Sequence, residues 1–199
     1  MDKFKNKYRI ASSRAQWWDY GINASYFITI CTKNREYYFG EISANKMHLS
    51  HTGLLADVFW QEINQHAKNV ELDAYVVMPN HIHGILILNK DVNFDKEGNN
   101  TGRETRHALS LPHQKKLILN ISLKRFQNQG KNTISSIIGS YKSAVTKHAN
   151  RLGLEFGWQQ RFHDHIIRNK AEFLKISNYI ENNAANWATD KFYKQVPND

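Results

Sequence analysis

Hydrophobic and polar positions along the chain predict four or five strands in its first half. Ala24–Thr32 and Leu72–Met78 are rich in aromatic and β-branched residues, as buried strands are. The segment His81–Leu88 continues this pattern after Pro79-Asn80, so it is expected to pair with the strand before it. The stretch 37–50 alternates around Gly40 and predicts a hairpin or a second strand.

Helical spacing of apolar residues predicts three helices. Thr52 is expected to cap the first, over about 53–68, and Thr133 the second, which runs to about Leu152. Asn169 is expected to cap the last, over about 171–187, after a short strand over Trp158–Ile167. The first helix is expected to turn one apolar face to the core, formed by Leu54, Leu55, Val58, Phe59 and Ile63. This order of elements favours an α+β fold, with helices on one face of an antiparallel sheet.

The chain divides into three kinds of segment. Residues 1–20 form a basic N-terminal arm, and residues 21–190 are expected to form one domain. Within that domain, residues 89–132 are rich in Gly, Asn, Lys and His with weak periodicity, which indicates a basic and largely irregular insertion. Trp17, Trp18 and Tyr20 follow the arm and suit either base stacking or burial in the core.

Composition narrows the class of partner. Lys and Arg number 27 against 18 Asp and Glu, a formal net charge of +9, which favours a polyanion such as nucleic acid. The single cysteine, Cys31, excludes an internal disulfide and all-cysteine zinc modules. No segment approaches the roughly 20 apolar residues of a membrane span, and no apolar run follows the basic N-terminus. A cytoplasmic protein without a membrane partner is expected.

Two histidine pairs have the spacing of a metal site. His81 and His83 lie two apart in a predicted strand, so both imidazoles point to one face while Ile82 points to the core. Adjacent imidazoles suit a divalent metal, although an H-x-H pattern also occurs at ordinary strand starts. His163 and His165 have the same spacing around Asp164, and His165 is a candidate phosphate contact.

The last predicted helix carries a candidate nucleophile. Tyr179 and Asn183 are four residues apart and share a helical face. A phenol near a metal-bound phosphate can act as a nucleophile, and an amide oxygen suits Mg²⁺ or Mn²⁺. Lys175 lies on the same side and is expected to lower the pKa of the phenol. Tyr179 also suits a core position, as Tyr141 does on the apolar stripe of its own helix.

Three motifs in order resemble the HUH single-tyrosine transposases, in particular the REP-associated tyrosine transposases and related transposase-like proteins. They are YVVMPNHIHGILIL, WQQRFHDHIIRN and NYIENNAANW, and the resemblance covers roughly residues 20–90 and 133–187. Relatives often have Asn-Pro after the tyrosine helix, whereas Asn183-Ala184 stands here, so the helix is expected to run on to Trp187.

The resemblance implies a ferredoxin-like domain that cuts and rejoins single-stranded DNA through a 5′-phosphotyrosine. It assigns His81, His83 and Asn183 to a divalent metal, Mg²⁺ or Mn²⁺, and Tyr179 to nucleophilic attack. Single-stranded or hairpin DNA is the expected partner, and both monomers and homodimers occur among such proteins. A non-catalytic DNA-binding relative and a phosphoesterase that uses water are the alternatives. The expected DNA contacts are Arg9, Arg14, Lys142, Lys147, Arg161 and Arg168.

Overall fold

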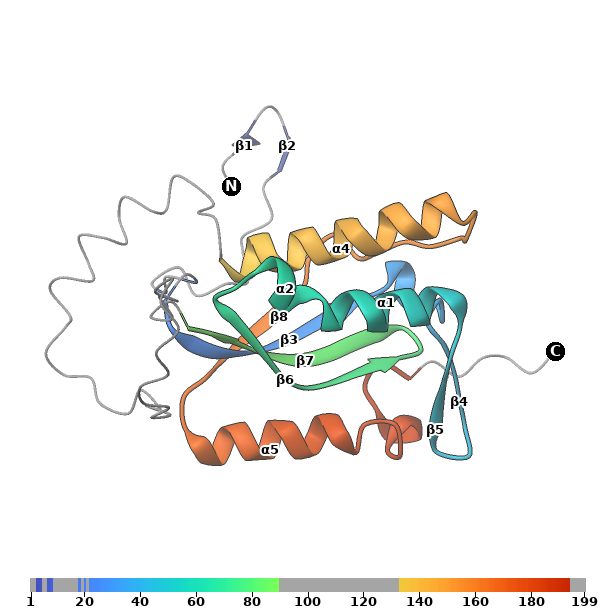
Figure 1. Cartoon of the computed structure of the whole chain (residues 1–199). Helices are drawn as coiled ribbons and strands as arrows, with labels where there is room; N and C mark the ends of the chain where they lie inside the picture. Colours follow the sequence, from blue (N-terminus) through green and yellow to red (C-terminus); the bar gives the residue numbers. More distant parts are fainter. Residues whose placement is uncertain are drawn as a thin grey trace, which may run out of the picture.

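The computed structural model describes residues 22–89 and 133–193, Trp18, Tyr20, and the backbone of two short strands near the N-terminus (Figure 1). Its strands are β1 (Lys3–Phe4), β2 (Lys7–Tyr8), β3 (Ala24–Cys31), β4 (Gly40–Ser43), β5 (Lys46–Leu49), β6 (Val70–Met78), β7 (His81–Leu88) and β8 (His163–Ile167). Its helices are α1 (His51–Gln61), α2 (Ile63–His66), α4 (Ile134–Arg151) and α5 (Lys170–Glu181), with 3₁₀ turns η1 (Lys33–Arg35) and η2 (Trp187–Thr189).

A four-stranded antiparallel sheet is the centre of the fold. Its order is β6-β7-β3-β8, and β3 pairs with both β7 and β8. Together with α1 after β3 and α4 after β7, this is the β-α-β-β-α-β arrangement of ferredoxin-like domains. The predicted α+β class with an antiparallel sheet is confirmed, and β4 and β5 form the predicted hairpin beside it.

Helices cover both faces of the sheet, so the expectation that all helices pack on one face was wrong. In Figure 1, α1, α2 and α4 lie above the sheet and α5 lies below it. Alternation along β7 explains this, because Ile82 and Leu86 join the core under α1 and α4 while Ile85 packs with Ile180 of α5. Both faces are apolar at these positions, and each therefore requires a helix to exclude water.

The first helix departs from its predicted boundaries. Ser50 caps it by accepting a hydrogen bond from Gly53 N (3.0 Å), so Thr52 is a buried helical residue and not the cap. Leu54 and Val58 are half exposed, and the buried face runs through Ala56 and Trp60 instead. The spacing of apolar residues did not show which face of the helix is buried, because apolar residues occur on both the buried and the exposed face.

The later elements are closer to expectation. Thr133 forms a capping box with Ser136 and α4 ends as predicted. Asn169 caps α5, but that helix stops at Glu181, where the Asn182 side chain donates to Asn178 O at 2.7 Å. Asparagine at a helix end competes for backbone groups in this way. The strand predicted over Trp158–Ile167 is shorter in the structure, where β8 begins at His163 and Trp158 forms only an isolated bridge to Thr32.

Several sequence predictions concern residues that the structure does not describe. Arg9, Arg14 and Trp17 in the arm, and the insertion beyond Asn89, lie outside the described residues. Trp18 and Tyr20 pack against the core, and Trp18 Nε1 donates to Tyr26 Oη at 3.0 Å. Among the described helices, none is long and apolar enough to cross a membrane.

Candidate metal and tyrosine site

The two histidines begin β7 on the face of the sheet that α5 covers. Both are fully buried, and their ring centroids lie 4.4 Å apart. The neighbouring Gly84 points the other way, where an added Cβ would meet Trp60 Cζ2 at 2.3 Å. The strand alternation expected from the sequence therefore places His81 and His83 side by side on a rigid backbone.

Hydrogen bonds orient both rings. Asn80 Nδ2 donates to Phe192 O (2.8 Å) and Arg35 O (3.3 Å), so its Oδ1 accepts from His81 Nδ1 at 2.9 Å. Thr29 Oγ1 lies 2.9 Å from Nδ1 of His83. Each imidazole is thereby held through Nδ1, and its Nε2 points to the other groups of the site. His81 Nε2 is buried and has no hydrogen-bond partner.

Both imidazoles are neutral near pH 7. Burial, the neighbouring His83, Lys191 and Arg35 lower the pKa of His81 well below its ordinary value. Burial lowers the pKa of His83 to about 3, although Asp190 opposes the shift. Neutral imidazole is the form that binds a metal, so no proton needs to be displaced from these residues at neutral pH.

Tyr179 of α5 meets the histidine pair. Its Oη lies 3.3 Å from His83 Nε2 and donates to Asp190 Oδ2 at 3.1 Å. The side chain is 41% exposed, so a substrate can reach the phenol. Burial and Asp190 raise the Tyr179 pKa to about 12, and Lys175 is exposed and does not lower it as expected from the sequence. Tyr179 is therefore a protonated phenol at neutral pH.

Asn183 lies just past the end of α5, four residues after the tyrosine, and is almost completely buried. Its Nδ2 donates to Asp190 Oδ2 at 3.3 Å, while its Oδ1 is buried without a partner. A buried acceptor without a hydrogen-bond partner costs free energy in an apolar interior, and a bound metal ion would satisfy this oxygen.

Asp190 was missed in the sequence. It follows η2, and the ligand atoms of His81, His83 and Asp190 lie within 4.8 Å of one another, the one such group among the described residues. The turn after α5 brings it back to Tyr179, and Asp190 Oδ1 accepts from Phe192 N at 2.7 Å. The sequence shows an aspartate soon after the Tyr-x₃-Asn pair, but it does not show that the chain turns back and brings this aspartate to the tyrosine.

The donor set of the site fits a divalent metal. Two neutral imidazoles and one carboxylate converge, the Asn183 amide contacts that carboxylate, and His81 Nε2 and Asn183 Oδ1 are buried without partners. Nitrogen and oxygen ligands of this kind are typical of divalent cations in proteins.

The other predicted contacts lie apart from this cluster. His165 Nε2 is 2.7 Å from Glu172 Oε1, and the other carboxylate oxygen of Glu172 accepts from the backbone N–H of Arg168. These two contacts join β8 to α5. Arg161 and His163 are exposed near the start of β8. The rival histidine pair thus forms no metal-ligand group among the described residues.

Lys142 and Tyr141 of α4 each donate a hydrogen bond to a backbone carbonyl elsewhere in the fold. Lys142 Nζ donates to Gln159 O at 2.6 Å, while Lys147 lines a shallow surface pocket beside it. Tyr141 is buried and donates its hydroxyl to Ala56 O at 2.9 Å. Burial raises the pKa of Tyr141 well above its ordinary value, and no metal-ligand group lies beside it in the described part of the chain.

Comparison with solved structures shows that the fold is shared with a known protein. The chain matches a REP-associated tyrosine transposase bound to a REP hairpin with a TM-score of 0.52, over 89% of this chain and 77% of that one, at 19% identity. The two proteins therefore share a fold.

Sequence comparison identifies a relative of this chain. An uncharacterized protein of Haemophilus influenzae is 34% identical over 183 residues, which cover 92% of each chain. The chain belongs to the same family as that protein. No protein-family model matches the sequence.

Proposed function

We propose that this protein is a metal-dependent HUH single-tyrosine transposase that cleaves and rejoins single-stranded DNA. The observation that carries the proposal is the position of Tyr179 Oη, 3.3 Å from His83 Nε2 and 3.1 Å from Asp190 Oδ2. A half-exposed phenol at a buried cluster of metal-type donors is the arrangement that covalent phosphoryl transfer needs. The fold shared with a solved tyrosine transposase and the net charge of +9 support it.

Three side chains would hold the metal. They are His81 and His83 through Nε2 and Asn183 through Oδ1, and the Asp190 carboxylate lies beside them and stays available as a proton acceptor. The sequence predicted these three, and Asp190 adds a negative charge that offsets part of the charge of the cation. A bound Mg²⁺ or Mn²⁺ supplies electrophilic activation of the scissile phosphate.

Tyr179 would carry out the covalent step. Its oxygen attacks phosphorus in line, the tyrosyl O–P bond forms, and the bond from phosphorus to the 3′ oxygen breaks. The phenolic proton passes to the hydrogen-bonded Asp190 carboxylate, and the released 3′ oxygen takes up a proton from solvent. The products are a 5′-phosphotyrosine and a free 3′-OH, and attack by another 3′-OH reverses the step.

The direction of the tyrosine pKa agrees with this role for Asp190. Because burial and Asp190 raise the Tyr179 pKa to about 12, a free phenolate is rare at neutral pH. Proton transfer therefore has to accompany attack, and a carboxylate already bonded to the hydroxyl provides the acceptor. Single-stranded or hairpin DNA is the proposed substrate.

A covalent trapping experiment tests the proposal. The protein is incubated with Mn²⁺ and a labelled hairpin-bearing single strand, and adducts are separated on a denaturing gel. Tyr179→Phe should bind the strand and form no adduct, whereas Tyr141→Phe should form the adduct at the wild-type level per folded molecule. Loss of the adduct in Tyr141→Phe alone would refute the assignment of the nucleophile.

Two further outcomes would replace the proposed function. Binding without cleavage by the wild type would indicate a non-catalytic DNA-binding protein. Metal-dependent cleavage without an adduct would indicate a phosphoesterase that uses water.

A further inference from the structure

A pocket of about 350 Å³ opens next to the tyrosine. It is lined by Tyr179, Asn183, Asn186, Thr189, Asp190 and Lys191. The volume is in the range of small-ligand sites, roughly 300 Å³ and above. Three of these residues, Asn186, Thr189 and Lys191, have no part in the proposed metal site or in the covalent step. The pocket therefore extends the site beyond the reacting groups.

The surroundings of this pocket are positively charged. Lys191 Nζ lies 4.8 Å from the centroid of the Phe192 ring, and Arg35 Cζ lies 4.9 Å from the same centroid. The Phe192 ring in turn lies 4.5 Å from the ring of His81. Two cations from distant segments thus meet beside the histidine pair, with Asp190 as the carboxylate of the pocket.

Backbone geometry indicates that Arg35 is held in a fixed position. Asn34 and Arg35 have φ values of 55° and 59°, in the left-handed region that residues other than glycine rarely adopt. The other such pair, Ala44 and Asn45, forms the tight turn between β4 and β5, which explains it. Asn34 and Arg35 likewise form a tight turn, in which Glu36 N donates to Lys33 O at 3.1 Å, and the hydrogen bond from Asn80 Nδ2 to Arg35 O ties this turn to the start of β7.

The uncharged lining residues offer groups that suit a nucleotide. Asn186 Nδ2 donates to Asn182 O at 3.0 Å, so the amide oxygen stays open to a donor from a ligand. Thr189 Oγ1 donates to Asn186 O at 3.0 Å and keeps its lone pairs. Amide and hydroxyl acceptors recognise the donor groups of base edges, while an ammonium group recognises phosphate.

We propose that this pocket binds the nucleotide next to the scissile phosphate, and that Lys191 and Arg35 contact backbone phosphates of the same strand. This inference rests on the proposed function, since it assumes that a single strand lies across Tyr179. It assigns recognition of the substrate to the segment that follows α5, and to η1, which lies far from it in sequence.

The salt dependence of binding tests the proposal. A fluorescein-labelled single-stranded oligodeoxynucleotide of mixed sequence is titrated with the full chain in EDTA, and anisotropy gives Kd over a series of salt concentrations. Lys191→Gln and Arg35→Gln should each weaken binding about tenfold at low salt, because each removes one charged hydrogen bond. Each should also reduce the slope of log K against log salt by about 0.7, the value for one phosphate contact on a single strand.

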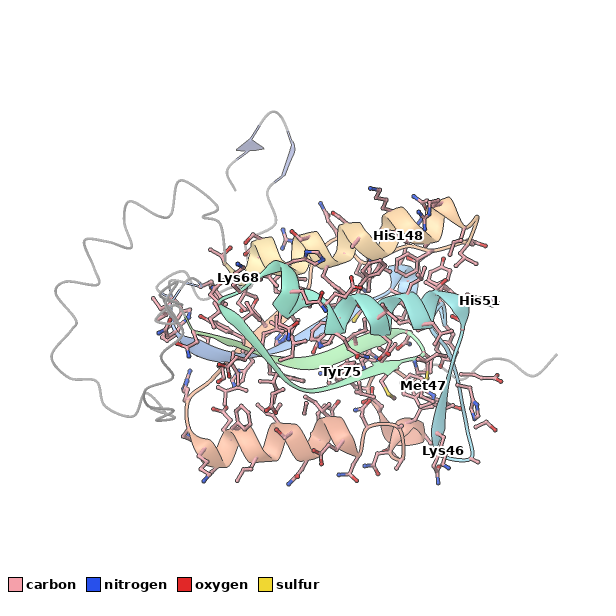
Figure 2. All side chains as sticks on the ribbon, viewed as in Figure 1. Lys46, Met47, His51, Lys68, Tyr75 and His148 are labelled. Carbon is pink, nitrogen blue, oxygen red and sulfur yellow. The ribbon has the colours of Figure 1, made fainter. Side chains whose placement is uncertain are left out.

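Matched variants separate a specific contact from a general loss of charge. Lys68→Gln removes one positive charge beside α2, on the side of the sheet opposite α5 (Figure 2), and should leave slope and affinity unchanged. Asn186→Ala should weaken binding about threefold without changing the slope, because it removes a neutral contact. Thermal unfolding of each variant confirms that it is folded.

The outcomes distinguish this proposal from the proposed function. If Lys191→Gln has the wild-type affinity and slope while the wild type forms a covalent adduct, the pocket assignment is wrong and the function stands. If the slope falls for Lys191→Gln but no wild-type adduct forms, the pocket is a nucleic-acid site and the transposase proposal fails. A wild-type chain that binds neither this oligonucleotide nor the hairpin-bearing strand refutes both.

Discussion

The two faces of the central sheet are built by the same strands but bury different kinds of side chain. Under α1 and α4 the sheet contributes a continuous apolar surface that includes Ile28, Ile30 and Ile82, all fully buried. Under α5 the apolar contacts of Ile85 give way, toward the start of β7, to buried His81 and His83. Burying polar groups without partners costs free energy, so the second face gives up stability for a site.

The two faces also differ in the surroundings of their tyrosines, Tyr141 and Tyr179. Tyr141 is buried with its hydroxyl bonded to Ala56 O, and its pKa is raised well above the ordinary value by burial. Tyr179 has a raised pKa as well, but it is 41% exposed and contacts His83 and Asp190. Perturbation of a phenol is therefore a poor guide to function unless exposure and neighbours are considered with it.

Adjacent residues of β7 provide the sharpest test of this comparison. His81→Ala should reduce Mn²⁺ affinity and adduct yield per folded molecule about a hundredfold or more, since a direct ligand is lost. Ile82→Ala should cost about 2–5 kcal/mol of unfolding free energy through a cavity, with the adduct yield per folded molecule unchanged. Urea unfolding and Mn²⁺ titration by electron paramagnetic resonance measure both. Equal effects of the two variants would contradict the division between faces.

Asn80 should affect the metal without touching it. Asn80→Ala removes the acceptor for His81 Nδ1 and two bonds to backbone carbonyls, so Mn²⁺ affinity should fall about 10–100-fold. Asn80→Asp keeps an acceptor for the imidazole and should recover part of the affinity. If both variants bind Mn²⁺ as the wild type does, the orienting role of Asn80 is wrong.

Stability should depend on pH through the buried histidines. Because burial lowers the His83 pKa to about 3 and also lowers that of His81, the unfolded chain binds protons that the folded chain does not. In EDTA, the unfolding free energy should therefore decrease as pH falls below the ordinary histidine pKa of 6.5, by up to about 1.4 kcal/mol per pH unit for each residue.

A double variant provides the control for this pH effect. His81→Gln combined with His83→Gln should flatten the dependence between about pH 7 and pH 5, as followed by urea unfolding. A slope that is the same in both proteins would show that other groups cause it.

The smallest expected effect lies at the start of α5. Glu172→Gln weakens the bonds of that carboxylate to His165 Nε2 and Arg168 N. Since both partners are partly exposed, the unfolding free energy should fall by about 1 kcal/mol or less. Thermal unfolding measures the change, and a larger loss would mean that this contact anchors α5 more strongly than its exposure indicates.

The sequence alone predicted the parts of the site that depend on local geometry. Alternation along His81–Leu88 was sufficient to place both imidazoles on one face, and helical spacing placed Tyr179 on the last helix, whereas Asn183 lies just past the end of that helix. The sheet class and the caps at Thr133 and Asn169 were predicted for the same reason. These features follow from the periods of strands and helices, which are properties of a few consecutive residues.

Only the tertiary structure decided how these local pieces meet. It placed α5 on the face opposite α1 and α4, ended that helix at Glu181, and returned the chain so that Asp190 reached Tyr179 and the histidine pair. It also brought Arg35 and Lys191 to the same Phe192 ring. Such contacts join residues far apart in sequence, and they are set by packing of the whole chain, which no local pattern encodes.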